Sequence, residues 1–281
     1  MRWCFRSIVL LVCAPAFLLA QIPSLDNSNQ GPKVSILRQG LSQAVAGAEQ
    51  SSDAPPAQSS GASSANDSRF TVSVTSLAAP DKAKKAFERG EEEVRKGKFE
   101  AAASYLRKAV DMYPRYAIAW LELGRVRSWQ SSFADAQQCF RQAVAQDAKL
   151  LDGYVELAHV DAQQQDWRDL AHVTDHLLEV APAASAEYWF LNSAAYYNLD
   201  NLQRAETSIT AGLRLDSRHE VAQMEYLYGL ILGSKKQYKQ AAEHVSAYLR
   251  LAPDAPDREA AQNLLAAYQY RAKRVENGED Q

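Results

Sequence analysis

The sequence predicts an all-α solenoid of about five helical pairs, followed by one capping helix, over residues 81–275. Three observations support this prediction. Residues of the same type recur at a spacing near 34 along most of the stretch, a period typical of stacked helical repeats. Within each copy the apolar residues follow the spacing of an amphipathic helix. Pro114, Pro182 and Pro253 fall near the ends of copies, where a helix has to stop.

The first twenty residues are typical of an export signal. Two arginines and no acid occur among the first six residues, an almost wholly apolar run follows, and Ala20 is small enough to precede a cleavage site. An uncleaved anchor and cleavage after the triplet 14–16 are the alternatives. The run is shorter than the roughly 20 residues that a spanning helix needs. We therefore expect a signal peptide over residues 1–20, an exported protein that is periplasmic or secreted, and no stable membrane span after cleavage.

Residues 21–80 differ in composition from the rest of the chain. They are rich in serine, alanine and glutamine and contain no tryptophan or tyrosine, so they cannot bury enough apolar surface to offset the entropy of ordering. We expect a flexible, disordered linker. Two segments leave an alternative open: residues 34–48 have helical apolar spacing, although Gly40 and Gly47 weaken it, and residues 70–75 alternate as a strand would.

The repeats become visible when the sequence is compared with itself. Gly90, Phe99 and Leu106 are followed 34 residues later by Gly124, Phe133 and Phe140. Further copies carry the corresponding large and small residues, with one or two inserted residues in the fourth and fifth. The copies span about residues 83–116, 117–150, 151–185, 186–221 and 222–255. Residues 257–274, with Ala260, Leu264, Leu265, Ala267 and Tyr268 on one side, are expected to form the helix that covers the last pair.

The second copy carries the pattern Trp-x-x-Leu-Gly at Trp120, Leu123 and Gly124, followed by Ala-x-x-x-Phe at Ala136 and Phe140. In these features the chain resembles the tetratricopeptide repeat (TPR) family, in its exported bacterial form. The resemblance implies a right-handed superhelical solenoid of helix-turn-helix repeats. It also implies a concave groove, lined by the first helix of each pair, in which a partner peptide lies.

Family groove positions, carried over to this sequence, give the candidate partner-binding residues. Aromatic and arginine side chains among them would provide large contact areas and directed hydrogen bonds, and the lining is expected to carry few charges. The family's groove positions lie on the first helix of each copy. The candidates at these positions are Arg125, Trp129, His159, Phe190, Tyr197, Asn198 and Tyr226.

Catalytic and metal-binding patterns are not evident in the sequence. His172 and His176 stand four residues apart on one helix face, but no third ligand occurs at motif spacing. Cys139 is the one cysteine beyond the first twenty residues; a nucleophile is possible, but its place in a helix favours a small buried residue. We expect no enzyme activity, no catalytic residue, no metal and no cofactor.

The sequence therefore predicts a non-catalytic scaffold for protein–protein interaction in the envelope or secreted space. The near balance of 31 Lys and Arg against 34 Asp and Glu does not favour nucleic acid as a partner. The alternative is a glycan or cell-wall binding module, in which exposed groove aromatics stack on sugar rings. The two hypotheses differ in whether those aromatics are exposed or packed between helices.

Overall fold

The computed structural model describes residues 77–278, which form eleven α-helices and no strand within that range. Five consecutive pairs are followed by a single helix, which confirms the predicted all-α repeat architecture. The helices are α3 (Asp81–Arg95), α4 (Phe99–Met112), α5 (Ala117–Trp129), α6 (Phe133–Gln146), α7 (Leu151–Gln164), α8 (Trp167–Val180), α9 (Ala186–Asn198), α10 (Leu202–Leu215), α11 (Gln223–Ser234), α12 (Tyr238–Leu251) and α13 (Arg258–Glu276).

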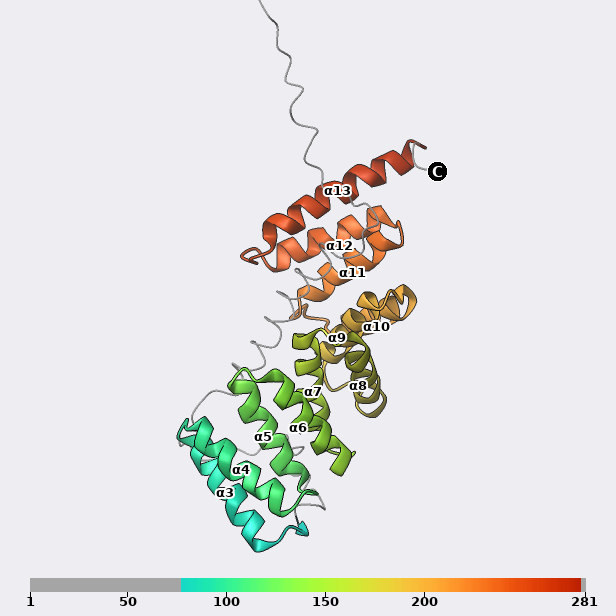
Figure 1. Ribbon diagram of the computed structural model, residues 1–281. Helices are drawn as coiled ribbons and strands as arrows, with labels where there is room; N and C mark the ends of the chain where they lie inside the picture. Colours follow the sequence, from blue (N-terminus) through green and yellow to red (C-terminus); the bar gives the residue numbers. More distant parts are fainter. Residues whose placement is uncertain (1–76, 279–281) are drawn as a thin grey trace, which may run out of the picture.

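The pairs stack in sequence order from α3 at one end to α13 at the other (Figure 1). Each helix packs on its neighbours in the chain, and each first helix also contacts the first helix of the next pair, as α5 does with α7. The second helices do not contact one another to the same extent. The first helices therefore form the closely spaced inner row, and the second helices form the outer row.

Glycines on the first helices explain how closely the two helices of a pair approach. A Cβ atom on Gly124 would lie 2.4 Å from Cε1 of Phe140, and one on Gly90 would lie 2.7 Å from Cγ of Leu106. Phe140 and Leu106 are fully buried. The 34-residue recurrence of a glycine and a large partner thus has a direct packing cause.

Two tryptophans tie a repeat to the end of the one before it. Trp120 of α5 donates a hydrogen bond from Nε1 to the carbonyl oxygen of Pro114 at 2.8 Å. Trp189 of α9 donates in the same way to Pro182, also at 2.8 Å. The carbonyl of a proline in the loop after one repeat is thereby hydrogen-bonded by a side chain of the next repeat.

A buried polar network joins α8, α9 and α10. The side-chain amide of Asn192 donates to Oγ1 of Thr174 at 2.9 Å and to Oδ1 of Asp175 at 2.8 Å, and it accepts from Ser208 at 2.5 Å. Asn192 is 2% exposed. Because its polar atoms are hydrogen-bonded, this network fixes the alignment of the three helices at little desolvation cost.

The capping helix α13 packs on α12 and buries Ala261 and Tyr268. Ala260, which the sequence placed on its inner side, is exposed. The expected export signal lies outside the described residues. So does the expected linker, with its possible helical and strand segments, except for its last residues, 77–80. In the part of the chain that the structure describes, no helix has the length and apolar character to cross a membrane.

Candidate partner-binding surface

The inner row of helices carries a set of charged and titratable side chains, which we call the first-helix face. Its members come from α3, α5, α7 and α9 and form two groups, one around Arg125 and one made of His159 and Glu187. They are Glu91, Glu122, Arg125, Asp152, Glu156, His159 and Glu187.

Arg125 lies at the centre of this face, between two successive repeats. Its Nη1 is 2.7 Å from Glu122 of the same helix, and its Nε is 2.8 Å from Glu156 of α7. Asp152 is 3.6 Å away. Burial disfavours the charged guanidinium, but the carboxylates of Glu122 and Glu156 outweigh this effect, so the pKa of Arg125 lies above its ordinary value.

The two ends of the face carry further carboxylates. Glu91 of α3 is half-buried. Burial and, to a smaller extent, the charge of Glu122 raise its pKa, while the charge of Arg95 on the same helix acts in the opposite direction. On the other side, His159 of α7 lies 3.3 Å from Glu187 of α9, measured from Nε2 to Oε1. Acidic groups therefore outnumber basic groups on this face, contrary to the sequence expectation of a lining with few charges.

Three of the aromatic candidates are buried and do not form part of this surface. Phe190 is 1% exposed, Tyr197 is 3% exposed and Tyr226 is 4% exposed, so they offer almost no area to a ligand. Phe190 and Tyr197 belong to the core around α7 to α11, and Tyr226 packs on Tyr248 with ring centroids 5.0 Å apart. We therefore reassign all three from partner contact to packing.

Trp129 and Asn198 lie at the ends of α5 and α9. Trp129 is 46% exposed, and its ring rests on Phe99 at 5.3 Å with a tilt of 47°. Asn198 is partly buried and donates a hydrogen bond to the carbonyl of Ala194. Of the seven candidates, Arg125, Trp129, His159 and Asn198 thus keep some accessible surface.

The residues considered for chemistry have ordinary packing roles. The ring of His176 packs against Tyr154 with centroids 4.3 Å apart and a tilt of 39°, and His172 is exposed. No group of three metal-ligating side chains occurs among the described residues. Cys139 is 5% exposed, and burial raises the pKa of its thiol to about 11. Its thiol is therefore protonated at neutral pH and a poor nucleophile.

Sequence reasoning missed Glu122 and Glu156, because both lie at helix positions outside the family's groove set. A sequence signal for them exists. Glu122 stands three residues before Arg125, a spacing that brings side chains together on one helix face, and Glu156 lies 34 residues after Glu122.

Comparisons with known proteins were consistent with this architecture. A model of the tetratricopeptide repeat matches residues 87–127 and 190–256. The segment between these two matches contains α6, α7 and α8, and therefore the whole third pair. Among curated proteins, none matches the chain significantly by sequence.

Several solved structures share the fold. YrrB, described as a TPR protein with an unusual peptide-binding site, has a TM-score of 0.58 at 18% identity, over 66% of this chain and 92% of YrrB. MamA from Desulfovibrio magneticus RS-1 has a TM-score of 0.55 at 18% identity, over 63% and 99% of the two chains. A tetratricopeptide repeat protein from Parabacteroides merdae has a TM-score of 0.57 at 14% identity, over 70% and 80%.

At these identities the similar structures establish the fold alone. The 34-residue sequence period, the five helical pairs and the family match agree with one another. The described residues therefore have the fold of a tetratricopeptide repeat stack, and residues 87–127 and 190–256 match that repeat in sequence.

Proposed function

We propose that the protein is an exported, non-catalytic scaffold of the cell envelope or secreted space, and that it binds an extended, positively charged segment of a protein partner along the first-helix face. Proteins with these repeats are generally interaction scaffolds without catalytic activity. YrrB, which shares the fold, is described as having a peptide-binding site. Both points favour a protein partner.

The charge of the first-helix face carries the proposal about the partner's chemistry. Carboxylates of α5 and α7 surround the guanidinium of Arg125, and a carboxylate of α9 lies beside the imidazole of His159. Glu91 of α3 lies near enough to Glu122 for the two charges to affect each other. Arg125 illustrates how the face holds a cation, because it forms ion pairs with carboxylates of two successive repeats, Glu122 on α5 and Glu156 on α7. Lysine or arginine side chains of a partner, spaced along the solenoid, would find comparable carboxylates at Glu91 and Glu187.

The glycan-binding alternative loses its main support. It required exposed aromatic rings on the inner row, whereas Phe190, Tyr197 and Tyr226 are buried. Trp129 remains exposed, but one tilted ring against Phe99 does not form a flat platform for successive sugar rings. We therefore retain the protein partner.

Export rests on the amino-terminal sequence, with its basic start and apolar run up to Ala20. Intact mass of the protein recovered from the envelope or medium of its native cell tests this part. The mature chain should begin at Gln21. A soluble cytoplasmic protein that retains Met1 would contradict the proposed location but not the proposed binding surface.

Binding is tested by fluorescence anisotropy with a labelled peptide of alternating lysine and alanine, titrated with the mature chain. Binding should weaken as salt is raised, and a peptide with glutamate in place of lysine should not bind. The paired substitution Glu91→Gln and Asp152→Asn removes two carboxylates from the first-helix face. Surface charge pairs are worth about 0.5–1 kcal/mol each, so the loss of two should lower affinity roughly five- to thirtyfold.

Asp111→Asn with Glu179→Gln is the matched control, because both residues are exposed acids on second helices. This control should leave the affinity of the lysine peptide unchanged. Equal losses in the two double variants would show that net charge alone attracts the peptide, and the proposal of a specific face would then be wrong.

A further inference from the structure

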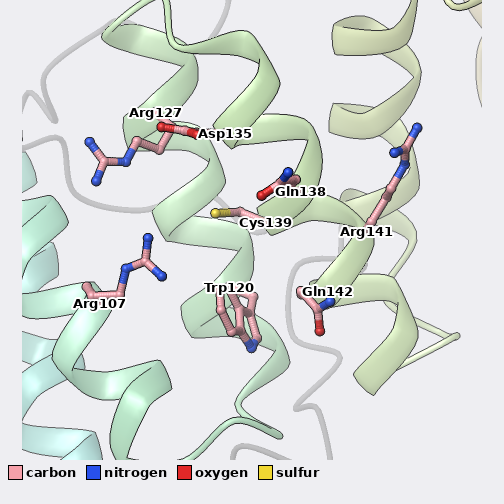
Figure 2. A pocket seen from close by; sticks show the side chains of 8 residues that line it. All are labelled: Arg107, Trp120, Arg127, Asp135, Gln138, Cys139, Arg141 and Gln142. Carbon is pink, nitrogen blue, oxygen red and sulfur yellow. The ribbon is translucent and has the colours of Figure 1, made fainter.

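A pocket of about 310 Å³ opens between α4, α5 and α6, and Arg125 is not among its lining residues. Trp120 and Arg127 line it from α5. They are seven residues apart and so share one side of that helix. Arg107 lines it from α4, and Cys139 lines it from α6. Figure 2 shows that these side chains come from three helices of two neighbouring pairs, with Arg107 and Arg127 on the left of the view and the ring of Trp120 below them.

The pocket carries more positive than negative charge. Arg107, Arg127 and Arg141 line it, against Asp135 as its acidic member. Arg141 is engaged with Asp169 of α8. Arg107 makes no ion pair within the described chain, and Arg127 donates one hydrogen bond to the neutral side chain of Gln130 at 3.1 Å. Among the residues that the structure describes, these two guanidinium groups, of which that of Arg107 is exposed, therefore have no carboxylate partner.

The uncharged part of the lining consists of Trp120, Cys139 and the two glutamines Gln138 and Gln142. The sulfur of Cys139 points toward the side on which Arg107 and Arg127 lie (Figure 2). Burial raises the pKa of this thiol to about 11, although the charges of Arg107 and Arg127 act in the opposite direction. Both guanidinium groups are thus close enough to affect the thiol, which nevertheless stays neutral. Trp120, whose Nε1 is already bonded to Pro114, contributes ring surface.

We infer that this pocket binds a small organic anion, with Arg107 and Arg127 holding its carboxylate or phosphate group and with Trp120 and Cys139 contacting its apolar part. Arginine pairs with both kinds of anion through directed N–H groups. The pocket volume is at the lower end of the range seen for small-molecule sites. This site is separate from the first-helix face, so an anion and a protein partner could be bound together.

Phenyl phosphate is a suitable probe, because it combines a phosphate with a flat apolar ring. The measurement is a two-dimensional ¹H–¹⁵N NMR titration of the mature chain, following the indole N–H signal of Trp120 as assigned with Trp120→Phe. The signal should shift to saturation. The double variant Arg107→Gln and Arg127→Gln should lose at least about tenfold in affinity, since each arginine supplies a charge-assisted hydrogen bond.

Arg168→Gln with Arg214→Gln is the matched control, since it removes the same charge from exposed positions on α8 and α10. It should bind phenyl phosphate like the unmodified chain. Benzyl alcohol, which keeps the ring without the charge, should not shift the Trp120 signal to saturation. The inference is overturned if phenyl phosphate produces no saturable shift, if both double variants bind equally, or if benzyl alcohol binds as tightly as phenyl phosphate. Unchanged thermal melting of both double variants confirms that they fold.

Discussion

At the scale of single residues, Asp161 of α7 combines full burial with incomplete hydrogen bonding. Its exposed fraction is 0%. Gln137 of α6 donates from Nε2 to Oδ1 at 2.7 Å, whereas Oδ2 has no hydrogen-bond partner in the described chain. Burial raises the pKa of Asp161 from 3.8 to about 6, and the Gln137 hydrogen bond opposes this only in part. An ionised Asp161 therefore costs stability at neutral pH.

Asp161→Asn should stabilise the protein at neutral pH. Because the folded-state pKa lies above the unfolded value, the stability linked to this proton is present at low pH and is lost as pH rises through about 6. Asparagine still accepts from Gln137 but cannot ionise, so the free energy of unfolding at pH 7 should rise by up to about 2–3 kcal/mol. Urea unfolding between pH 4 and 7.5 measures the difference between the two chains. A difference that does not grow from pH 4 to pH 7 would contradict the assignment.

Trp120 and Trp129, nine residues apart on α5, should respond differently to truncation. Trp120 packs against two core clusters and bonds to Pro114, so Trp120→Ala should cost about 3 kcal/mol as a core truncation. Trp129 is 46% exposed, and Trp129→Ala should cost about 1 kcal/mol or less. Thermal and urea melts of the two variants provide the comparison. Equal destabilisation would mean that Trp129 is a core residue.

Helical spacing identified some positions of the partner-binding surface but not their exposure. It placed Arg125 and His159 on the inner row, where the structure has them. It also placed Phe190 and Tyr226 there, although both are buried. Spacing gives the direction of a Cα–Cβ bond. Whether a ring then lies on the surface depends on neighbours such as Tyr248 of α12, whose position follows from the packing of whole helices.

At the scale of elements, the turn inside each pair has a common backbone conformation. One residue in each turn has a positive φ: Gly97 at 69°, Ser131 at 59°, Gln165 at 63°, Asp200 at 58° and Lys236 at 61°. Only the first of these is a glycine. The left-handed conformation is unfavourable for a residue with a Cβ atom, so four of the five turns carry a local strain that glycine would relieve.

Gln165→Gly should therefore stabilise the third pair. Relief of the left-handed conformation is worth roughly 1–2 kcal/mol, and the greater freedom of glycine in the unfolded chain offsets part of it, so we expect a net gain of about 0.5–1 kcal/mol. Gly97→Ala is the reverse test, because it places a residue with a Cβ atom in the left-handed conformation. It should destabilise the first pair by a similar amount. Urea midpoints measure both. Destabilisation by Gln165→Gly would show that its side chain has an important contact.

At the scale of the whole molecule, stability should be distributed along the stack, because each pair contacts mainly its neighbours. The helix α13 closes one end: Tyr268 lies against the fifth pair, where a Cβ on Gly233 would come within 2.2 Å of its hydroxyl oxygen. Tyr226, Val245 and Tyr248 belong to the same cluster. Loss of α13 would expose this cluster to solvent.

A chain truncated after Pro256 should therefore lose order locally. Amide hydrogen exchange, compared with the full chain, should accelerate most in α11 and α12 and least in α3 and α4. The full chain carrying the surface substitution Gln262→Ala on α13 serves as control and should exchange normally, since Gln262 is exposed. Uniform acceleration along the whole stack would show that the solenoid unfolds as a single cooperative unit.

The period of 34 residues was enough to predict the stack, because each copy repeats the small and large residues that pack its two helices together, as Gly124 and Phe140 do. The charge of the first-helix face could not be predicted in the same way. Glu122 and Glu156 reach Arg125 only through long side chains, and the pairing of α5 with α7 depends on how successive repeats stack. The period does not specify that geometry.

The central claim is that a partner is held by the inner row of helices, and its most direct test is hydrogen exchange of the mature chain with and without the alternating lysine–alanine peptide. The account predicts that saturating peptide slows amide exchange in α5, α7 and α9, which carry the central carboxylates, and leaves α6, α8 and α10 unchanged. Protection confined to the second helices, or spread evenly over both rows, would contradict it.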